Sequence, residues 1–139
     1  IMKMIRPFTT AVDRLTAVGL RPTRQRLALA RLLFEDGNRH ITAEQLHREA
    51  TEGDIKVSLA TVYNTLNQFT EVGLLREVAV EAGRAYFDTN ITNHHHFFNN
   101  DTGDLLDIPG DSVVLSAMPE VPENTVIGAI DVVVHLRNK

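Results

Sequence analysis

Residues 58–73 read SLATVYNTLNQFTEVG, and this stretch decides the fold. Ser58 is a favourable N-cap and Gly73 a favourable stop, and between them apolar residues recur at intervals of three and four. The spacing predicts a helix with one buried face. The residues of that face are Leu59, Val62, Leu66 and Phe69.

The opposite face of this predicted helix carries almost no formal charge. Its residues are Thr61, Tyr63, Asn64, Asn67 and Gln68. A solvated helix face is normally rich in charged residues. Hydroxyl and amide groups instead suit hydrogen bonding to base edges in the major groove of DNA. The face therefore indicates a DNA contact.

Helix signals come before this stretch and strand signals after it. Pro7, Thr23 and Thr42 each begin an apolar pattern of helical spacing. Residues 74–80 and 85–88 read as two strands joined by a tight turn at 81–84. Four helices followed by a hairpin is the element order of a winged-helix DNA-binding module. The alternative is a small helical domain whose hairpin has no role in DNA binding.

Charge is distributed unevenly along the chain. Residues 1–34 hold seven basic residues and one acidic residue, whereas residues 81–139 hold three basic and nine acidic residues, within a net charge of -4. A basic end predicts a polyanionic partner such as double-stranded DNA. The alternative is surface charge that clusters by chance.

Composition excludes several classes of protein. The 139 residues suffice for one or two small domains, and the absence of cysteine excludes disulfides, thiolate zinc sites and a cysteine nucleophile. No apolar run approaches the length of a membrane span. We therefore expect a cytoplasmic protein without a membrane partner.

Three consecutive histidines, His94, His95 and His96, stand out in a chain with six. In an extended segment side chains alternate, so His94 and His96 share one face and His95 points to the other. Two imidazoles on one face can bind one metal ion or lie beside a haem iron. The alternative is a polar hinge.

The remaining segment predicts a small second domain. Residues 105–108 read as a short strand, Asp111 or Ser112 as the cap of a brief helix to Met118, and 126–136 as a long strand. Such a short segment could hardly stand alone as a domain. We expect it to bury its sheet against a second copy, which gives a homodimer with two recognition helices.

Several runs resemble the ferric uptake regulator (Fur) family. They are residues 19–23 (GLRPT), residues 40–46 (HITAEQL) and, above all, residues 58–66 (SLATVYNTL), and the similarity continues to Gly103. Within the family, a chain with three consecutive histidines and no cysteine is most similar to Irr, the haem-responsive iron regulator of alphaproteobacteria. The resemblance implies an α+β fold: a winged-helix DNA-binding domain over 1–88 and a small α/β dimerisation domain over 89–139.

The resemblance also implies a function. The expected protein is a dimeric transcriptional regulator, mainly a repressor, of iron homeostasis and haem biosynthesis genes, and not an enzyme. It would bind A·T-rich inverted repeats. Tyr63 occupies the place of a base-contacting tyrosine, Asn64 replaces the usual arginine, and Arg21 takes the place of a residue that enters the minor groove. The full expected DNA-binding set is Arg21, Arg24, Arg26, Ser58, Thr61, Tyr63 and Asn64.

The implied ligand sites centre on the histidines. The expected metal ligands are His40, Asp88, His94, His96 and Asp107, a nitrogen and oxygen set that suits Fe, Mn or Zn. Resemblance to Irr implies haem binding by His94, His95 and His96. A second metal site of the family is expected to be absent, because Val114 stands where a glutamate is needed. We expect haem to weaken DNA binding; the alternatives are a divalent metal that promotes it, or a metalloenzyme.

Overall fold

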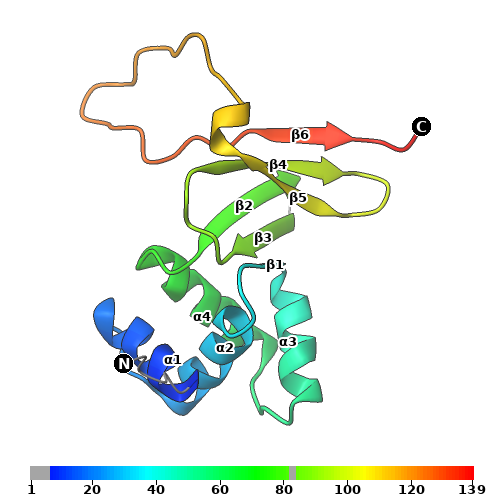
Figure 1. The fold of residues 1–139 in the computed structure, drawn as a ribbon. Coiled ribbons are helices and arrows are strands. Elements are labelled where there is room, and N and C mark those ends of the chain that lie inside the picture. The colour runs from blue at the N-terminus through cyan, green and yellow to red at the C-terminus, as the bar shows by residue number, and fades with distance from the viewer. Residues whose placement is uncertain (1–6, 82–83) are drawn as a thin grey trace, which may run out of the picture. The chain divides into compact units, whose positions relative to one another are not determined.

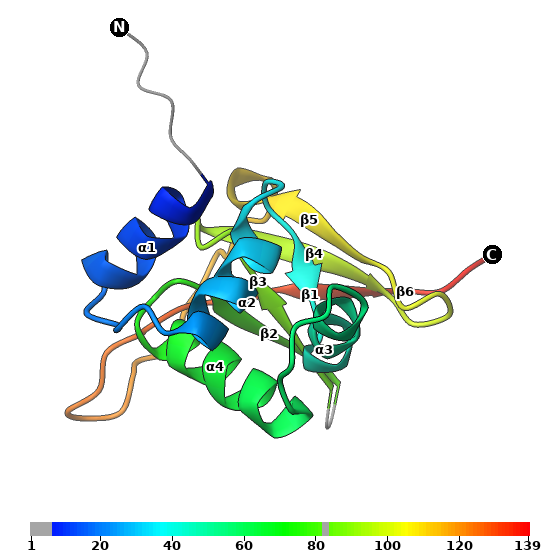
Figure 2. The same ribbon diagram turned by 90° about the horizontal axis from the view of Figure 1, so that it is seen from below.

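The computed structural model describes residues 7–81 and 84–139. The chain divides into two compact units, Ile1–Ile91 and Thr92–Lys139, and the sequence had placed the boundary after Asp88. Helices and sheets are both present, so the fold is α+β (Figures 1 and 2). In the described residues no helix is long and apolar enough to cross a membrane.

The described part of the first unit contains four helices. They are α1 (Pro7–Ala17), α2 (Arg24–Phe34), α3 (Ala43–Glu52) and α4 (Leu59–Glu71). Thr23, Thr42 and Ser58 each accept a hydrogen bond from the backbone N–H three residues on, at 3.3, 3.2 and 3.1 Å. These side chains satisfy donors that a helix start leaves unpaired, which confirms the predicted starts of α2, α3 and α4.

A three-stranded antiparallel sheet completes the first unit. Its strands are β1 (His40–Ile41), β2 (Arg76–Glu81) and β3 (Arg84–Asp88), in the order β1-β3-β2. The predicted hairpin is therefore present, although residues 82 and 83 of its turn lie outside the described residues. Strand β1 was not predicted, since two residues are too few to show a period. It pairs His40 with Asp88.

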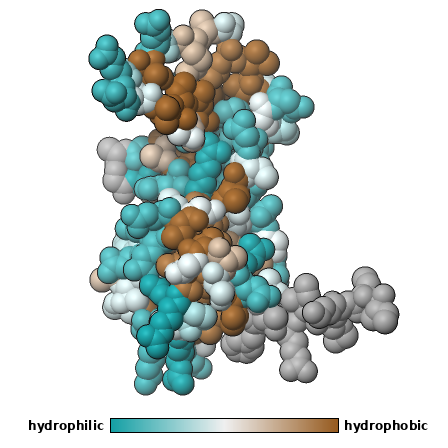
Figure 3. Space-filling view, turned by 90° about the vertical axis from the view of Figure 1, so that its left-hand side faces the viewer, coloured by the Kyte–Doolittle hydropathy of each residue, from teal (hydrophilic) through white to brown (hydrophobic). Residues whose placement is uncertain are grey.

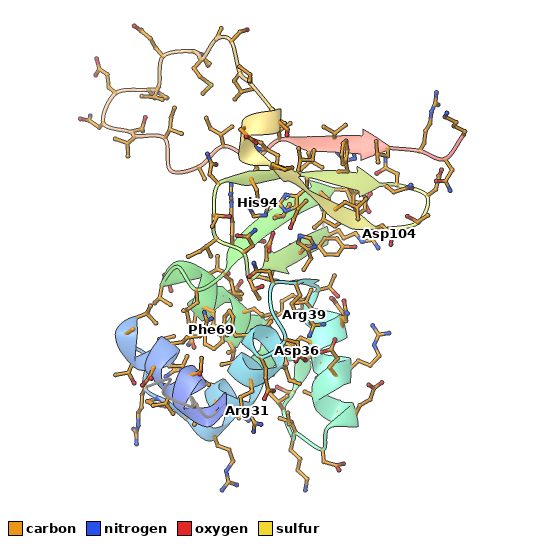
Figure 4. The ribbon with its side chains drawn as sticks, viewed as in Figure 1. Arg31, Asp36, Arg39, Phe69, His94 and Asp104 are labelled. Atoms are coloured by element: carbon orange, nitrogen blue, oxygen red, sulfur yellow. The ribbon has the colours of Figure 1, made fainter. Side chains whose placement is uncertain are left out.

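The core of the first unit lies among the helices and under β3. Phe69, Leu66 and Val62 of α4 are fully buried, and they pack with Leu29 and Leu33 of α2. Figure 4 shows Phe69 directed from α4 into this interior. The predicted buried face of α4 is correct at these three positions. The prediction is wrong at Leu59, which is 37% exposed because the first turn of α4 extends beyond the core.

The second unit is a three-stranded sheet with the histidine strand in its centre. Strands β4 (His94–Asn99), β5 (Leu105–Pro109) and β6 (Val133–Leu136) lie in the order β5-β4-β6. Strand β4 pairs antiparallel with β5 and parallel with β6. Phe98 and Ile108 supply its buried apolar side chains.

Two predictions in this unit are wrong. The helix expected up to Met118 is only a 3-10 turn, Gly110–Ser112, which lacks a side-chain cap and is followed by irregular chain. The strand expected over 126–136 is limited to β6, since β4 pairs with it over only four residues. High strand propensity does not form a strand where no neighbouring strand is available to pair with it.

Candidate functional site

The second unit brings together three of the expected metal ligands. His94 and His96 lie on the same face of β4, and the register pairs His96 with Asp107 of β5. The Nε2 atoms of His94 and His96 lie 3.5 and 3.3 Å from the same carboxylate oxygen, Oδ1 of Asp107. The two rings are 4.6 Å apart (Figure 4 labels His94). Two imidazole nitrogens and a carboxylate directed at one point suit a divalent metal ion.

A backbone contact orients the His94 ring for this role. Its Nδ1 lies 2.6 Å from the carbonyl oxygen of Thr92. A carbonyl only accepts, so Nδ1 carries a proton here, and in the neutral ring Nε2 then keeps the lone pair that a metal ion needs. Metal-ligating histidines are commonly fixed in this way by a hydrogen bond from the second ring nitrogen. One ligand atom each from His94, His96 and Asp107 lies within 4.8 Å of the other two, so these residues fit an ion.

His95 points to the opposite face of β4. Its Nδ1 accepts a hydrogen bond of 3.1 Å from the backbone N–H of Val132, which holds the chain just before β6. The ring lines a hollow of about 370 Å³ with apolar residues such as Ile127 and Ile130. The three histidines therefore divide two and one between the faces, as strand alternation predicts.

The first unit brings together the other two expected ligands. His40 of β1 and Asp88 of β3 are directly paired, and His40 Nε2 lies 3.3 Å from Asp88 Oδ2. The other carboxylate oxygen, Oδ1, accepts a 2.8 Å hydrogen bond from the backbone N–H of Asn90. Asp88 is thus held as an oriented oxygen donor beside an imidazole.

Arg39 anchors the start of β1 next to His40. Its guanidinium donates two hydrogen bonds to Glu49 of α3, at 2.9 and 2.7 Å, and one to the carbonyl of Leu32. Its backbone N–H donates to Thr89 Oγ1 at 2.8 Å. Figure 4 shows Arg39 beside α3. The sequence analysis missed this residue, because none of its partners is close in sequence.

The expected DNA-binding residues lie on α2, α4 and the loop before α2. Tyr63 and Asn64 are exposed on the outer face of α4, Thr61 is partly exposed, and Arg21 and Arg24 are exposed. Ser58 is used as the N-cap of α4 and also donates to Thr61 Oγ1 at 2.9 Å.

Arg26 and Tyr63 have protein partners that the sequence did not indicate. The Arg26 guanidinium donates to the Arg21 carbonyl at 2.9 Å and to Gln68 Oε1 at 3.2 Å, and so connects the loop before α2 to α4. The Tyr63 hydroxyl donates to Glu44 Oε1 at 2.5 Å. Glu44 was not singled out, since no local pattern relates it to a residue on the next helix.

Comparison with known proteins identifies the class. The sequence pattern that defines the ferric uptake regulator family matches residues 17–131. The chain belongs to this family. The ferric uptake regulation protein of Shigella flexneri is 34% identical over 100 residues, which cover 71% of this chain and 68% of the relative. That of Rhizobium leguminosarum is 33% identical over 99 residues, covering 70% and 69%.

Solved Fur structures share the fold. The ferric uptake regulator of Pseudomonas aeruginosa, solved with manganese, matches with a TM-score of 0.70 at 25% identity and covers 93% of this chain and 98% of its own. That of Vibrio cholerae matches with a TM-score of 0.69 at 21% identity, covering 91% and 98%. Fur proteins are metal-responsive transcriptional regulators, and the chain is assigned to that class.

Proposed function

We propose that this Fur protein is a dimeric repressor in the cytoplasm that binds A·T-rich inverted repeats and is activated by a divalent metal ion. The observation that carries the proposal is the convergence of His94 and His96 on Asp107, with His94 fixed by Thr92. The manganese in the Pseudomonas aeruginosa regulator supports Mn, Fe or Zn as the ion. By its family, the target would be iron homeostasis genes.

His40 and Asp88 would ligate the same ion as His94, His96 and Asp107. Five residues, 89–93, separate Asp88 at the end of β3 from His94 at the start of β4. An ion that takes ligands from both sides of this short linker would restrict the first unit, proposed as the winged-helix DNA-binding domain, relative to the second. Binding shifts an equilibrium only by its differential affinity for the two states. The ion would therefore favour the conformer that spans both halves of an inverted repeat.

The DNA contacts would come from the first unit. Its four helices and hairpin have the element order of a winged helix, in which the helix before the hairpin enters the major groove. In this protein that helix is α4, with Tyr63 and Asn64 on its outer face. Exposed Arg21 and Arg24 are suited to phosphate or minor-groove contacts. Arg26 would act mainly by holding the Arg21 loop against α4.

The second unit would form the dimer interface. Its irregular segment exposes large apolar side chains to an extent unusual for a folded monomer: Val126 is 89% exposed, Val114 84%, Ile127 49% and Met118 49%. Figure 3 shows apolar side chains gathered at the top of the view. A second copy would bury these residues. Sedimentation equilibrium should then give a dimer, and a monomer at micromolar concentration would contradict it.

Haem, the effector implied by the resemblance to Irr, is the alternative. The two-and-one division of the histidines gives it less support than a metal ion, since His95 faces away from His94 and His96 and already accepts a hydrogen bond from Val132. Of the two phenylalanines that follow the histidines and could pack on a porphyrin, Phe98 is buried in the sheet and only Phe97 is partly exposed. Direct haem control would thus require rearrangement of the second unit.

The test is fluorescence anisotropy of a labelled A·T-rich inverted-repeat duplex at one fixed salt concentration. We expect Mn²⁺ or Zn²⁺ to tighten binding at least tenfold and a chelator to reverse this, which corresponds to about 1.4 kcal/mol of coupling. His96→Ala should remove the metal effect. His135→Ala, an exposed histidine of the same unit, should keep it. Metal-independent binding that weakens when haem is added would overturn the proposal in favour of the Irr-like function.

A further inference from the structure

A hydrogen bond joins the proposed recognition helix to the helix before it. The hydroxyl of Tyr63, on α4, donates to Oε1 of Glu44, on α3, at 2.5 Å. Tyr63 is 39% exposed, so its ring and oxygen remain accessible to a DNA ligand while its proton is directed at Glu44. Neither helix needs this bond for its fold, because α3 and α4 already pack through buried residues such as Leu46 and Val62.

Glu44 is held in its ionised form. It lies in the first turn of α3, where the partial positive charge of the helix N-terminus favours a carboxylate. The Tyr63 hydroxyl and the backbone N–H of Glu44 itself lower the pKa of the carboxyl. In turn, the hydrogen bond to Glu44 raises the pKa of Tyr63, since a phenolate would face a carboxylate. The proton therefore stays on Tyr63, and the direction of the bond is fixed.

Other charged groups line the same hollow as Tyr63. Tyr63 and Glu44 line a hollow of about 470 Å³ with three residues of the hairpin strands, Glu77, Glu81 and Arg84. Arg84 donates to Glu81 at 3.0 Å, which pairs the cation with that acid. Glu44 is thus the acid that disfavours a phenolate at Tyr63.

We propose that Glu44 is a positioning residue that sets the base preference of Tyr63. A tyrosine hydroxyl has one proton and two lone pairs. With the proton given to Glu44, Tyr63 presents only acceptor capacity to the DNA. In the major groove the base donors are the amino groups of adenine and cytosine, whereas guanine and thymine present acceptors at the equivalent edge. Tyr63 therefore selects adenine or cytosine at its contact. This inference rests on the proposed DNA-binding function.

The first test needs no DNA. The chain has two tyrosines and no tryptophan, so in a Tyr86→Phe background the near-ultraviolet absorbance of phenolate reports Tyr63 alone. We expect its pKa to lie above the ordinary value of 10.0 and to return towards that value in Glu44→Ala. Glu52→Ala removes an exposed acid from the same helix and should leave the titration unchanged. An unchanged titration in Glu44→Ala would overturn the inference.

The second test measures base preference. Metal-loaded protein selects sites from a random duplex library, and the enriched sequences are compared between variants. The unaltered protein should prefer adenine or cytosine about tenfold at one position in each half-site, and Tyr63→Phe should lose that preference. Glu44→Ala should also lose it, since the freed hydroxyl can either donate to or accept from a base and no longer distinguishes between them. Glu44→Gln, which keeps an acceptor oxygen, should retain part of it.

The readout is the ratio of affinities between duplexes, not affinity itself. Removing any acid near DNA strengthens binding to all sequences, and Glu52→Ala controls for that general effect. If the unaltered protein enriches no site, the proposed function fails. If it enriches a site and Glu44→Ala keeps the same preference, the function stands and the role of Glu44 is refuted.

Discussion

Replacement of Glu49 by glutamine tests the anchor that positions His40. The Glu49 carboxylate accepts hydrogen bonds from both terminal nitrogens of Arg39, at 2.9 and 2.7 Å. It accepts a longer hydrogen bond from Gln45 at 3.4 Å. The two side chains are 29% and 27% exposed, so the pair is only partly screened by water. Exposed ion pairs contribute about 0.2–1 kcal/mol, and hydrogen bonds to charged groups about 1.5–3 kcal/mol. We therefore expect Glu49→Gln to cost about 2 kcal/mol near neutral pH.

The loss should depend on pH with a defined sign. The hydrogen bonds from Arg39 lower the pKa of Glu49 in the folded protein, against the opposing effect of burial. A carboxyl whose pKa is lowered on folding contributes stability that is fully present above its ordinary value of 4.5 and is lost as pH falls through the lowered value. The difference between the unaltered protein and Glu49→Gln should therefore shrink in acid.

Urea unfolding followed by far-ultraviolet circular dichroism measures this difference, because the α-helices in the described residues all belong to the first unit. Titrations at about pH 7 and about pH 3.5 lie above and below the ordinary value of 4.5, below which the loss of this stability begins. Glu52→Gln, on the same helix, is the matched control and should change stability by less than about 0.5 kcal/mol. An equal loss at both pH values, or an equal loss in the control, would refute the reasoning.

Three further predictions concern the core, the second unit and the DNA contacts. Phe69→Ala, at a fully buried side chain, should cost about 3–5 kcal/mol in urea unfolding, and a loss below about 1 kcal/mol would contradict the described core. Gly110→Ala would place a Cβ atom 2.5 Å from the Asn93 carbonyl oxygen, just before β4. The backbone would have to shift, so the amide hydrogens of β4 should exchange faster with solvent. Gly128→Ala, with open space around the new Cβ atom, should leave the exchange rates unchanged. Arg24→Ala should lower the slope of log affinity against log salt by about 1, and Arg137→Ala, on the second unit, should leave that slope unchanged.

Local signals account for the parts of the fold that the sequence predicted well. The start of α4 follows from Ser58, whose side chain caps the helix, and its buried face follows from the spacing of Val62, Leu66 and Phe69. The alternation of His94, His95 and His96 follows from the strand period alone. Each of these features depends on residues within one element.

Pairing between distant segments accounts for the parts that sequence patterns could not predict. The register that sets Asp107 beside His96, and β1 with its His40, depends on tertiary contacts, so these ligands were expected only from the family resemblance. The 126–136 segment has strand composition, yet only its last four residues pair with β4 as a strand. The bond between Glu44 and Tyr63 joins residues 19 apart on different helices, and no local period relates them.

The metal affinity of the His40→Ala variant is the measurement that tests the central claim most directly. The claim is that one ion takes ligands from both units, so that metal controls DNA binding. Equilibrium dialysis should give one Mn²⁺ or Zn²⁺ per chain in the unaltered protein, with affinity reduced at least tenfold in His40→Ala and in His96→Ala alike. If His40→Ala binds the ion as tightly as the unaltered protein while His96→Ala does not, the second unit holds the metal alone and the proposed coupling is wrong.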